Sequence, residues 1–219
     1  MDDETLKAVA GQLRKPNGEF AVKISGKMNQ SNALMNLSAI EFLSVKPGEH
    51  ILEIGMANGF FVKDILSSDH TVKYTGCDFS EEMIKEAITL NAAYIASEQA
   101  QFICNAVNSL PFSENSFDKI FTVNTLYFWE EPNVSLQEIR RVLKPGGKFT
   151  VSIRPDSVMQ VLPFTAYGFR LFSKEELLLL LSKNGFTTDN ILEQAEPDQE
   201  INGRKYKMSY LHVTAGLNK

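Results

Sequence analysis

Apolar residues follow two alternating patterns along the chain. Short, continuous apolar runs predict buried strands, whereas apolar residues at helical spacing predict amphipathic helices. The predicted strands lie at 50–54, 71–78, 101–106, 117–123 and 148–153, and the predicted helices between them at 60–66, 80–99 and 131–143. Strands that alternate with helices in this way are typical of a parallel sheet covered by helices on both faces.

The two ends of the chain have different patterns. Before the first strand, residues 1–13 and 29–43 have helical spacing, with a break at 14–20 that contains Pro16 and Asn17-Gly18. After residue 154 comes an aromatic-rich connection to 172. A helix then opens with a capping box at Ser173 and Glu176 and ends before Gly185. Strand-like runs at 186–193 and 206–215, joined by a polar loop at 196–205, predict an antiparallel hairpin.

Together these elements predict an α/β protein. We expect a Rossmann-like, doubly wound, mostly parallel sheet of seven strands, with the hairpin antiparallel at its C-terminal edge. We also expect one domain over 1–219, in which 1–45 is a helical lid or substrate segment, 48–154 the cofactor-binding core and 155–219 the substrate side.

Composition and charge exclude only a few classes of function. The chain has 219 residues, of which 43% are hydrophobic, and a formal charge of −5. That charge gives no general attraction to nucleic acid or anionic membranes. No apolar run approaches the roughly 18 residues of a membrane span, and the acidic N-terminus does not resemble a secretory signal. We therefore expect a soluble cytoplasmic protein without membrane insertion or a nucleic-acid partner. Cys77 and Cys104 are predicted to be buried free thiols, and the spacing of Cys and His predicts no metal.

Polar and small residues gather where the predicted strands end. In open α/β sheets ligands bind at the carboxyl ends of the strands. The residues found there are Glu53 with the turn Gly55, Met56, Ala57 and Gly59, then Asp78, then Asn105, Ala106 and Val107, and finally Asn124 to Tyr127. A small-residue turn, a carboxylate about 20 residues further on, and an amide followed by backbone N–H groups predict a nucleoside site.

The charge of Glu53 indicates which kind of nucleoside ligand the site would bind. A carboxylate about 4–6 Å from a pyrophosphate would repel it by several kcal/mol at low effective dielectric, whereas it would favour an ammonium or sulfonium. Ala57 also stands where a pyrophosphate needs its closest approach to the backbone. The turn therefore favours a cationic ligand over an anionic dinucleotide.

Four segments carry a resemblance to a known family. They are ILEIGMANGFF, YTGCDFSEEMIKEA, FICNAVNSLPFSENSFDKIFTVNTLYFW and EIRRVLKPGGKFTVSI, which cover about residues 48–154. In this order they resemble class I S-adenosylmethionine-dependent methyltransferases, in particular the small-molecule group. The later segment YGFRLFSKEELLLLLSKNGF is similar to the penultimate helix and strand of that family.

The resemblance implies a cofactor, S-adenosyl-L-methionine, and a role for each site residue. Glu53 would hold the methionine ammonium, Gly55 and Gly59 would pass under the methionine part, and Asp78 would accept from the ribose hydroxyls. Phe79 and Met83 would flank the adenine, Asn105 with the Ala106–Val107 backbone would meet its amino edge, and Asn124 would lie beneath the sulfonium. Two departures from the family pattern are Ala57 for the second glycine and Asn105 for an acid.

Each residue also has a purely structural interpretation. The glycines can close a tight turn, Asp78 can assist the helix cap at Ser80, and Asn105 can be a turn residue. Tyr127, Phe128 and Trp129 are equally consistent with core packing. The aromatic residues of the connection, Phe164, Tyr167, Phe169 and Phe172, fit core packing better than a substrate wall.

The expected reaction is in-line methyl transfer to an O, N, S or C nucleophile of a small-molecule acceptor. The catalytic residue is open, with Tyr127 as a weak candidate. Residues 14–32 and 154–172 are expected to select the acceptor, and Arg154 and Arg170 suit one that is partly apolar, with or without an anionic group. Two alternatives are a catalytically silent S-adenosylmethionine-binding module and a nicotinamide-dependent oxidoreductase.

Overall fold

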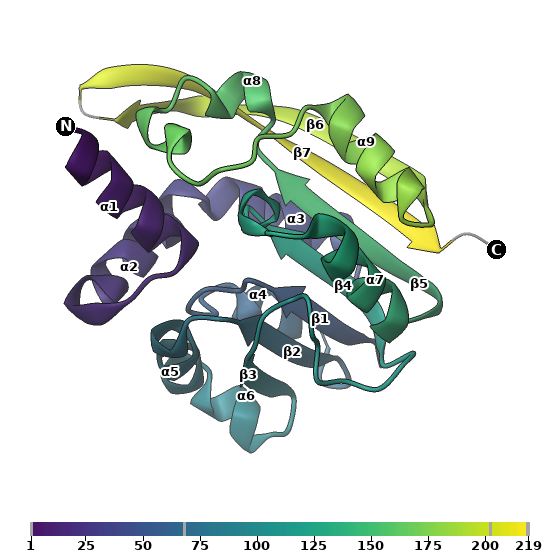
Figure 1. The fold of residues 1–219 in the computed structure, drawn as a ribbon. Helices are drawn as coiled ribbons and strands as arrows, with labels where there is room; N and C mark the ends of the chain where they lie inside the picture. Colours follow the sequence, from purple (N-terminus) through teal and green to yellow (C-terminus); the bar gives the residue numbers. More distant parts are fainter. Residues whose placement is uncertain (1, 68, 202, 218–219) are drawn as a thin grey trace.

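A seven-stranded sheet forms the centre of the protein, in a computed structural model that describes residues 2–67, 69–201 and 203–217 (Figure 1). The strands are β1 (His50–Ile54), β2 (Lys73–Asp78), β3 (Ala100–Cys104), β4 (Phe117–Val123), β5 (Leu143–Ile153), β6 (Phe186–Ile201) and β7 (Arg204–Leu217). Their order is β3-β2-β1-β4-β5-β7-β6, and β7 runs antiparallel to both of its neighbours. The predicted fold class is confirmed, including the antiparallel hairpin.

The strand order reverses between β1 and β4. From β1 the chain proceeds through β2 to β3 on one side, then returns to place β4 on the other side of β1. Such a switch point opens a crevice at the carboxyl ends of the two central strands. The sheet topology therefore predicts where a ligand would lie.

Helices cover both faces of the sheet, as the alternation predicted. The helices are α1 (Asp3–Arg14), α2 (Ala21–Ser31), α3 (Ala33–Leu43), α4 (Val62–Leu66), α5 (Glu81–Leu90), α6 (Ala92–Ala96), α7 (Pro132–Val142), α8 (Asp156–Met159) and α9 (Lys174–Lys183), with 3₁₀ turns η1 (Gly18–Phe20), η2 (Leu126–Phe128) and η3 (Pro163–Ala166). Neighbouring residues of β1 enter different cores: Ile51 packs with α3 and α4, and Leu52 with α7 and α9. This division follows from the two-residue period of a strand.

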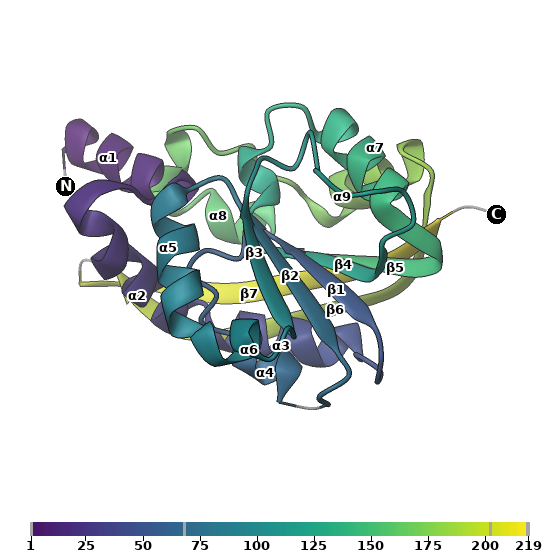
Figure 2. The same ribbon diagram turned by 90° about the horizontal axis from the view of Figure 1, so that it is seen from below.

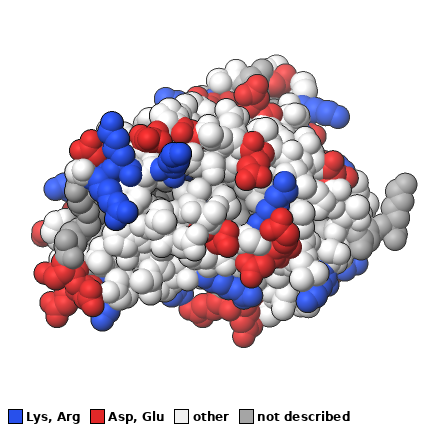
Figure 3. Space-filling view, turned by 90° about the horizontal axis from the view of Figure 1, so that it is seen from above, with Lys and Arg blue, Asp and Glu red and all other residues white. Residues whose placement is uncertain are grey.

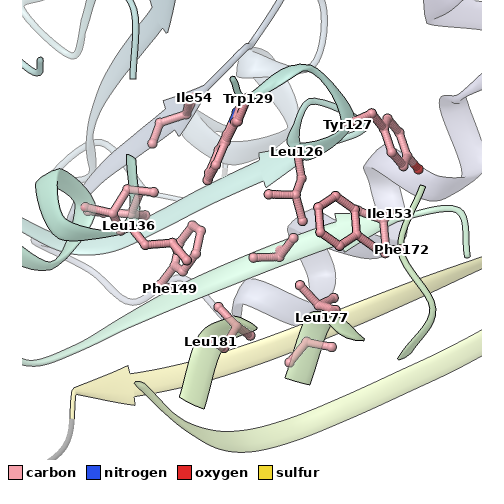
Figure 4. Close-up of a cluster of buried hydrophobic side chains, with 14 of the residues drawn as sticks. Ile54, Leu126, Tyr127, Trp129, Leu136, Phe149, Ile153, Phe172, Leu177 and Leu181 are labelled. Atoms are coloured by element: carbon pink, nitrogen blue, oxygen red, sulfur yellow. The ribbon is translucent and has the colours of Figure 1, made fainter. Parts of the chain in front are cut away.

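The core under α7 and α9 is the larger of the two (Figure 4). Leu136 and Ile139 of α7 and Leu177 and Leu181 of α9 are fully or almost fully buried in it. Tyr127 belongs to this core as well. On the opposite edge of the sheet α5 and α6 lie against β3, and α2 contacts α5 (Figure 2).

Several local sequence signals are confirmed. Ser80 caps α5, with its hydroxyl accepting from the Met83 N–H. Ser173 and Glu176 form the capping box of α9. Gly185 follows the C-cap of this helix with a φ of 80°, a conformation that L side chains rarely adopt.

Two predictions need correction. The helix predicted at 29–43 is two helices, α2 and α3, which meet at Asn32. The polar loop predicted at 196–205 largely continues the two strands. Here β7 extends past β5, and its buried Tyr206, Met208 and Tyr210 alternate with more exposed residues. A strand that pairs on one side and buries one face can be polar elsewhere, which hid it in the sequence.

The two cysteines differ in their surroundings. Cys77 is buried, as expected, but Cys104 is exposed because it is the last residue of the edge strand β3. On the face seen in Figure 3, acidic and basic side chains are interspersed around uncharged areas, without a large patch of one sign. In the described part of the chain, no helix combines the length and the apolar character of a membrane span.

Candidate functional site

A cavity of about 330 Å³ lies at the carboxyl ends of the central strands. The predicted site residues that line it are Glu53, Gly55, Met56, Ala57, Asp78, Phe79, Asn105, Ala106, Val107 and Asn124. Gly59, Met83 and Tyr127 do not line it. Segments from four strand ends therefore meet at the switch point, as the ligand rule for open sheets predicts.

The turn after β1 forms the floor of this cavity. Gly55 has a φ of 72°, and a Cβ atom built on it would lie 2.2 Å from Cγ2 of Thr125. Its N–H donates to the Cys77 carbonyl at 2.7 Å, which fixes the turn to β2. Ala57 has a φ of 51°, a conformation that glycine adopts more easily. The alanine therefore keeps a glycine-like backbone at a cost of about 1–2 kcal/mol.

Gly59 packs closely against the end of α5, and its contact with a ligand stays a prediction. A Cβ atom there would lie 3.0 Å from Nδ2 of Asn91 and 3.2 Å from Cβ of Ala87, both on the α5 side. The Gly59 carbonyl accepts from the Asn91 side chain at 3.1 Å. Met83 is fully buried and does not line the cavity, so its place beside a ligand stays a prediction.

Asp78 connects the turn to the next strand. Its Oδ2 accepts from the Ala57 N–H at 3.0 Å, and its Oδ1 accepts from the Ser80 N–H at 2.9 Å. Burial raises the pKa of Asp78 to about 6, although these backbone hydrogen bonds oppose the rise. Each carboxylate oxygen has a second lone pair, so the side chain can still accept from ligand hydroxyls.

Glu53 is the second buried carboxylate of the cavity. Only 6% of its surface is exposed, and its Oε2 accepts from the Tyr74 hydroxyl at 2.6 Å. Burial raises the pKa of Glu53 to about 7, the Tyr74 hydrogen bond opposes this rise, and the negative Asp78 adds to it. A positively charged group in the cavity would stabilise the ionised form of Glu53.

The amide of Asn105 faces its own backbone. Its Oδ1 accepts from the Ala106 N–H at 2.8 Å, and the backbone N–H of Asn105 donates to the Asp78 carbonyl at 3.0 Å. The side chain therefore acts as a turn residue as well as a cavity wall, and the Ala106 N–H already has an acceptor.

Tyr127 orients Asn124 and does not face the cavity. Its hydroxyl donates to Oδ1 of Asn124 at 3.1 Å or to the Arg154 carbonyl at 3.0 Å, and it accepts from the Arg154 N–H at 2.5 Å. Burial raises the pKa of Tyr127 well above its usual value. This arrangement disfavours the ionised phenol that a base would need, and the weak candidacy of Tyr127 as a catalytic residue stays a prediction. Asn124 has a φ of 57°.

The N-terminal helices close one side of the cavity. Residues of this wall are Leu13, Arg14, Pro16, Met28, Asn29, Asn32 and Asn36. The wall is held at several points: the Ser80 hydroxyl donates to the Pro16 carbonyl at 2.5 Å, and Nδ2 of Asn124 donates to Oδ1 of Asn32 at 3.2 Å. Further along α2, the Ser25 hydroxyl donates to Glu86 at 2.9 Å.

This wall lies within residues 1–45, the segment that the sequence predicted to be a helical lid or substrate segment. After β4, Thr125 and residues 128–131 line the cavity beside Asn124. Of these residues, sequence reasoning missed Glu130 and Glu131. The signal for them is their place shortly after a central strand.

Arg154 and Arg170 lie outside the cavity, which corrects the expectation that they meet an acceptor. Arg154 forms a buried ion pair with Glu196 of β6. Arg170 is exposed and lies 5.1 Å from the centre of the Phe172 ring. The aromatic residues of the connection pack against the core: Phe169 contacts Tyr127 and Phe128, and Phe172 is buried.

The chain is similar in sequence to proteins that are named as methyltransferases. Residues 52–151 match the family model described as a methyltransferase domain. Over 128 residues the chain is 29% identical to the uncharacterized methyltransferase YdaC of Bacillus subtilis, covering 58% of this chain and 68% of that protein. It is also 29% identical to the O-methyltransferase resE of Aspergillus sclerotiorum, covering 66% of this chain but only 57% of the relative.

A solved structure supports the fold. The complex between the Haloferax volcanii Trm112 methyltransferase activator and a putative methyltransferase contains a chain that superimposes with a TM-score of 0.79. The match covers 91% of this chain and 95% of that one, at 18% identity, so it establishes the fold alone. The methyltransferase-domain match over residues 52–151 and the relatives named as methyltransferases together support a class I S-adenosylmethionine-dependent methyltransferase.

Proposed function

We propose that this protein transfers a methyl group from S-adenosylmethionine to a small-molecule acceptor. The observation that carries the proposal is the pair of buried carboxylates, Glu53 and Asp78, on either side of the turn that starts at Gly55. The pyrophosphate of an anionic dinucleotide would be repelled by Glu53, whereas Asp78 can accept from ribose hydroxyls in either kind of cofactor. A ligand with an ammonium and a neutral ribose satisfies both.

The residues present fit this cofactor. Glu53 would hold the methionine ammonium, and Asp78 would accept from the ribose hydroxyls. Phe79, Ala106 and Val107 would contact the adenine, with Asn124 near the sulfonium. The glycine-like backbone at Gly55 and Ala57 supports close approach of the ligand to the turn.

When bound, the cofactor supplies an activated methyl group: an acceptor lone pair forms a bond to the methyl carbon while the S–CH₃ bond breaks and its electrons stay on sulfur. The contribution of the chain is to position the acceptor and exclude water. Asn124 is oriented by Tyr127, and the N-terminal wall, including Asn32, covers the cavity.

Calorimetric titration tests the proposal against its alternatives. Saturable binding of S-adenosylmethionine and its demethylated product, without binding of NADH, supports it. Binding of NADH alone would identify a nicotinamide-dependent oxidoreductase instead. Transfer of a labelled methyl group into a metabolite extract separates an active enzyme from a silent binding module.

Cofactor affinity should depend on pH through Glu53. The pKa of this side chain is about 7, so below this pH a proton must leave before the ammonium binds. Affinity should therefore rise by up to about tenfold per unit as pH approaches 7, then level off. Titrations at several pH values check the rise, and repeats in buffers of different ionisation enthalpy check the proton release. In Glu53→Gln the affinity for the cofactor should no longer rise between pH 6 and 7. A wild-type affinity that stays constant from pH 6 to 8 would contradict the predicted contact between Glu53 and the ammonium.

The same raised pKa acts on the stability of the ligand-free protein. In the unfolded chain Glu53 ionises near 4.5, whereas in the folded chain its pKa is about 7. Between these values the unfolded chain binds fewer protons, so the contribution of Glu53 to the free energy of unfolding falls as pH rises. Asp78, with a pKa of about 6, acts in the same direction.

Asp78→Asn should weaken binding of S-adenosylmethionine by about 1–3 kcal/mol, because an amide cannot replace both acceptor oxygens. Calorimetry with the cofactor measures the effect. Asp189→Asn is a matched control, since this carboxylate pairs with Lys148 and does not line the cavity. Equal affinity in the two variants would remove Asp78 from the cofactor site.

A further inference from the structure

The segment after β4 forms part of the cavity wall. Phe128, Trp129, Glu130 and Glu131 all line the cavity. Phe128 is half-buried and only 7% of Trp129 is exposed, whereas both glutamates are exposed to solvent. This segment, residues 128–131, therefore has aromatic side chains inside and carboxylates at the mouth.

The charged side chains that line the cavity have mainly one sign, and the Lys15 ammonium lies just outside it, 5.2 Å from the centre of the Phe79 ring. Among the described residues that line it, Arg14 is the single Lys or Arg, against the carboxylates of Glu53, Asp78, Glu130 and Glu131. The Arg14 guanidinium lies 2.5 Å from Oε1 of Glu130, so its charge is already compensated. Glu131 has no ion pair or hydrogen bond from its side chain to any described residue.

Aromatic faces beside carboxylates favour positively charged ligands. A cation is attracted both by the ring quadrupole and by the negative charges, and a carboxylate or phosphate is repelled by both. The two arginines that suited an anionic acceptor lie elsewhere, with Arg154 paired to Glu196. An anionic acceptor would therefore meet no Lys or Arg without an ion pair among the described residues that line the cavity.

We infer that the methyl acceptor is a cationic molecule, with an ammonium or substituted ammonium group held at the mouth by residues 128–131. The inference rests on the proposed function, since it assigns the cofactor to the Glu53 and Asp78 side of the cavity. The charged group lies at the mouth, while the atom that receives the methyl group lies deeper, nearer to Asn124.

Cofactor analogues with an extended arm test this directly. In each analogue a nitrogen replaces the sulfur of S-adenosylmethionine, and a three-carbon arm that ends in an ammonium, a hydroxyl or a carboxylate replaces the methyl group. Calorimetry at pH 8 and low salt should give the tightest binding for the ammonium arm. We expect about five- to tenfold tighter binding than for the hydroxyl arm, and a further loss for the carboxylate. Added salt should reduce the differences, because the glutamates are exposed.

A pair of variants locates the effect. Glu131→Gln should bring the ammonium and hydroxyl arms to within about threefold of each other and leave the affinity for the parent amine with a methyl group unchanged. Glu175→Gln, an exposed glutamate of α9 outside the cavity, should keep the wild-type preference. Tightest binding of the hydroxyl or carboxylate arm, or equal binding of all three, would overturn the inference. Failure of the parent analogue to bind would instead overturn the proposed function, and the inference with it.

Discussion

Gly55→Ala is expected to abolish measurable cofactor binding and to lower the free energy of unfolding by about 2–5 kcal/mol. The new Cβ atom would lie 2.2 Å from Cγ2 of Thr125, in a backbone with a φ of 72°. Left-handed backbone costs about 1–2 kcal/mol for an L side chain, and overpacking adds about 1–3 kcal/mol. Relief of the clash must move either the turn or Thr125, and both line the cavity. Chemical denaturation and calorimetry with S-adenosylmethionine measure the two effects.

Two further variants separate the clash from the backbone strain. Gly48→Ala has a similar φ of 78° but no heavy atom within 4 Å of the new Cβ, so it should lose stability without losing cofactor affinity. Thr125→Ser removes the clashing methyl group, so adding it to Gly55→Ala should restore part of the binding. Wild-type affinity of Gly55→Ala would show that the turn is not the floor of the cofactor site.

Arg154→Met is expected to lower the free energy of unfolding by about 3–5 kcal/mol, because it leaves Glu196 buried without its partner. Only 4% of the Arg154 side chain and 3% of the Glu196 side chain are exposed. The guanidinium also donates to the Ser209 carbonyl at 3.3 Å. Urea denaturation monitored by far-UV circular dichroism gives the change.

An exposed ion pair of the same sheet region serves as the control. Lys174 and Glu193 lie 3.6 Å apart with 39% and 52% of their side chains exposed, so Lys174→Met should change stability by less than about 1 kcal/mol. Combining Arg154→Met with Glu196→Leu should recover most of the loss, since apolar replacements of a buried pair are often neutral. A loss in Arg154→Met no larger than in the control would mean that the pair is solvated.

Sequence patterns predicted the parts of the fold that depend on nearby residues. The apolar runs of β1 and β4, the cap at Ser80 and the capping box at Ser173 are each encoded within a few positions. The cavity residues at the strand ends followed from topology, because parallel strands bring their carboxyl ends to one edge.

What the sequence left undetermined depends on contacts between distant segments. Tyr127 was considered as a catalytic residue because its partner Arg154 is 27 positions away in the sequence. Arg154 was considered as a contact for the acceptor because its partner Glu196 is a further 42 positions along the chain. The N-terminal wall has little pattern of its own, and its position depends on partners such as Ser80 and Glu86. Such pairings leave no periodic signal in the sequence.

The N-terminal wall has a kinetic consequence. It is attached on the cofactor side, where Pro16 meets Ser80, and on the hairpin side, where the Ser31 carbonyl accepts from Nε2 of Gln199 at 2.8 Å. A segment fastened on both sides of a cavity must release an attachment before a ligand can pass it, so these hydrogen bonds slow entry as well as departure. The rate of ligand exchange past this wall is thus tied to hydrogen bonds between protein groups alone.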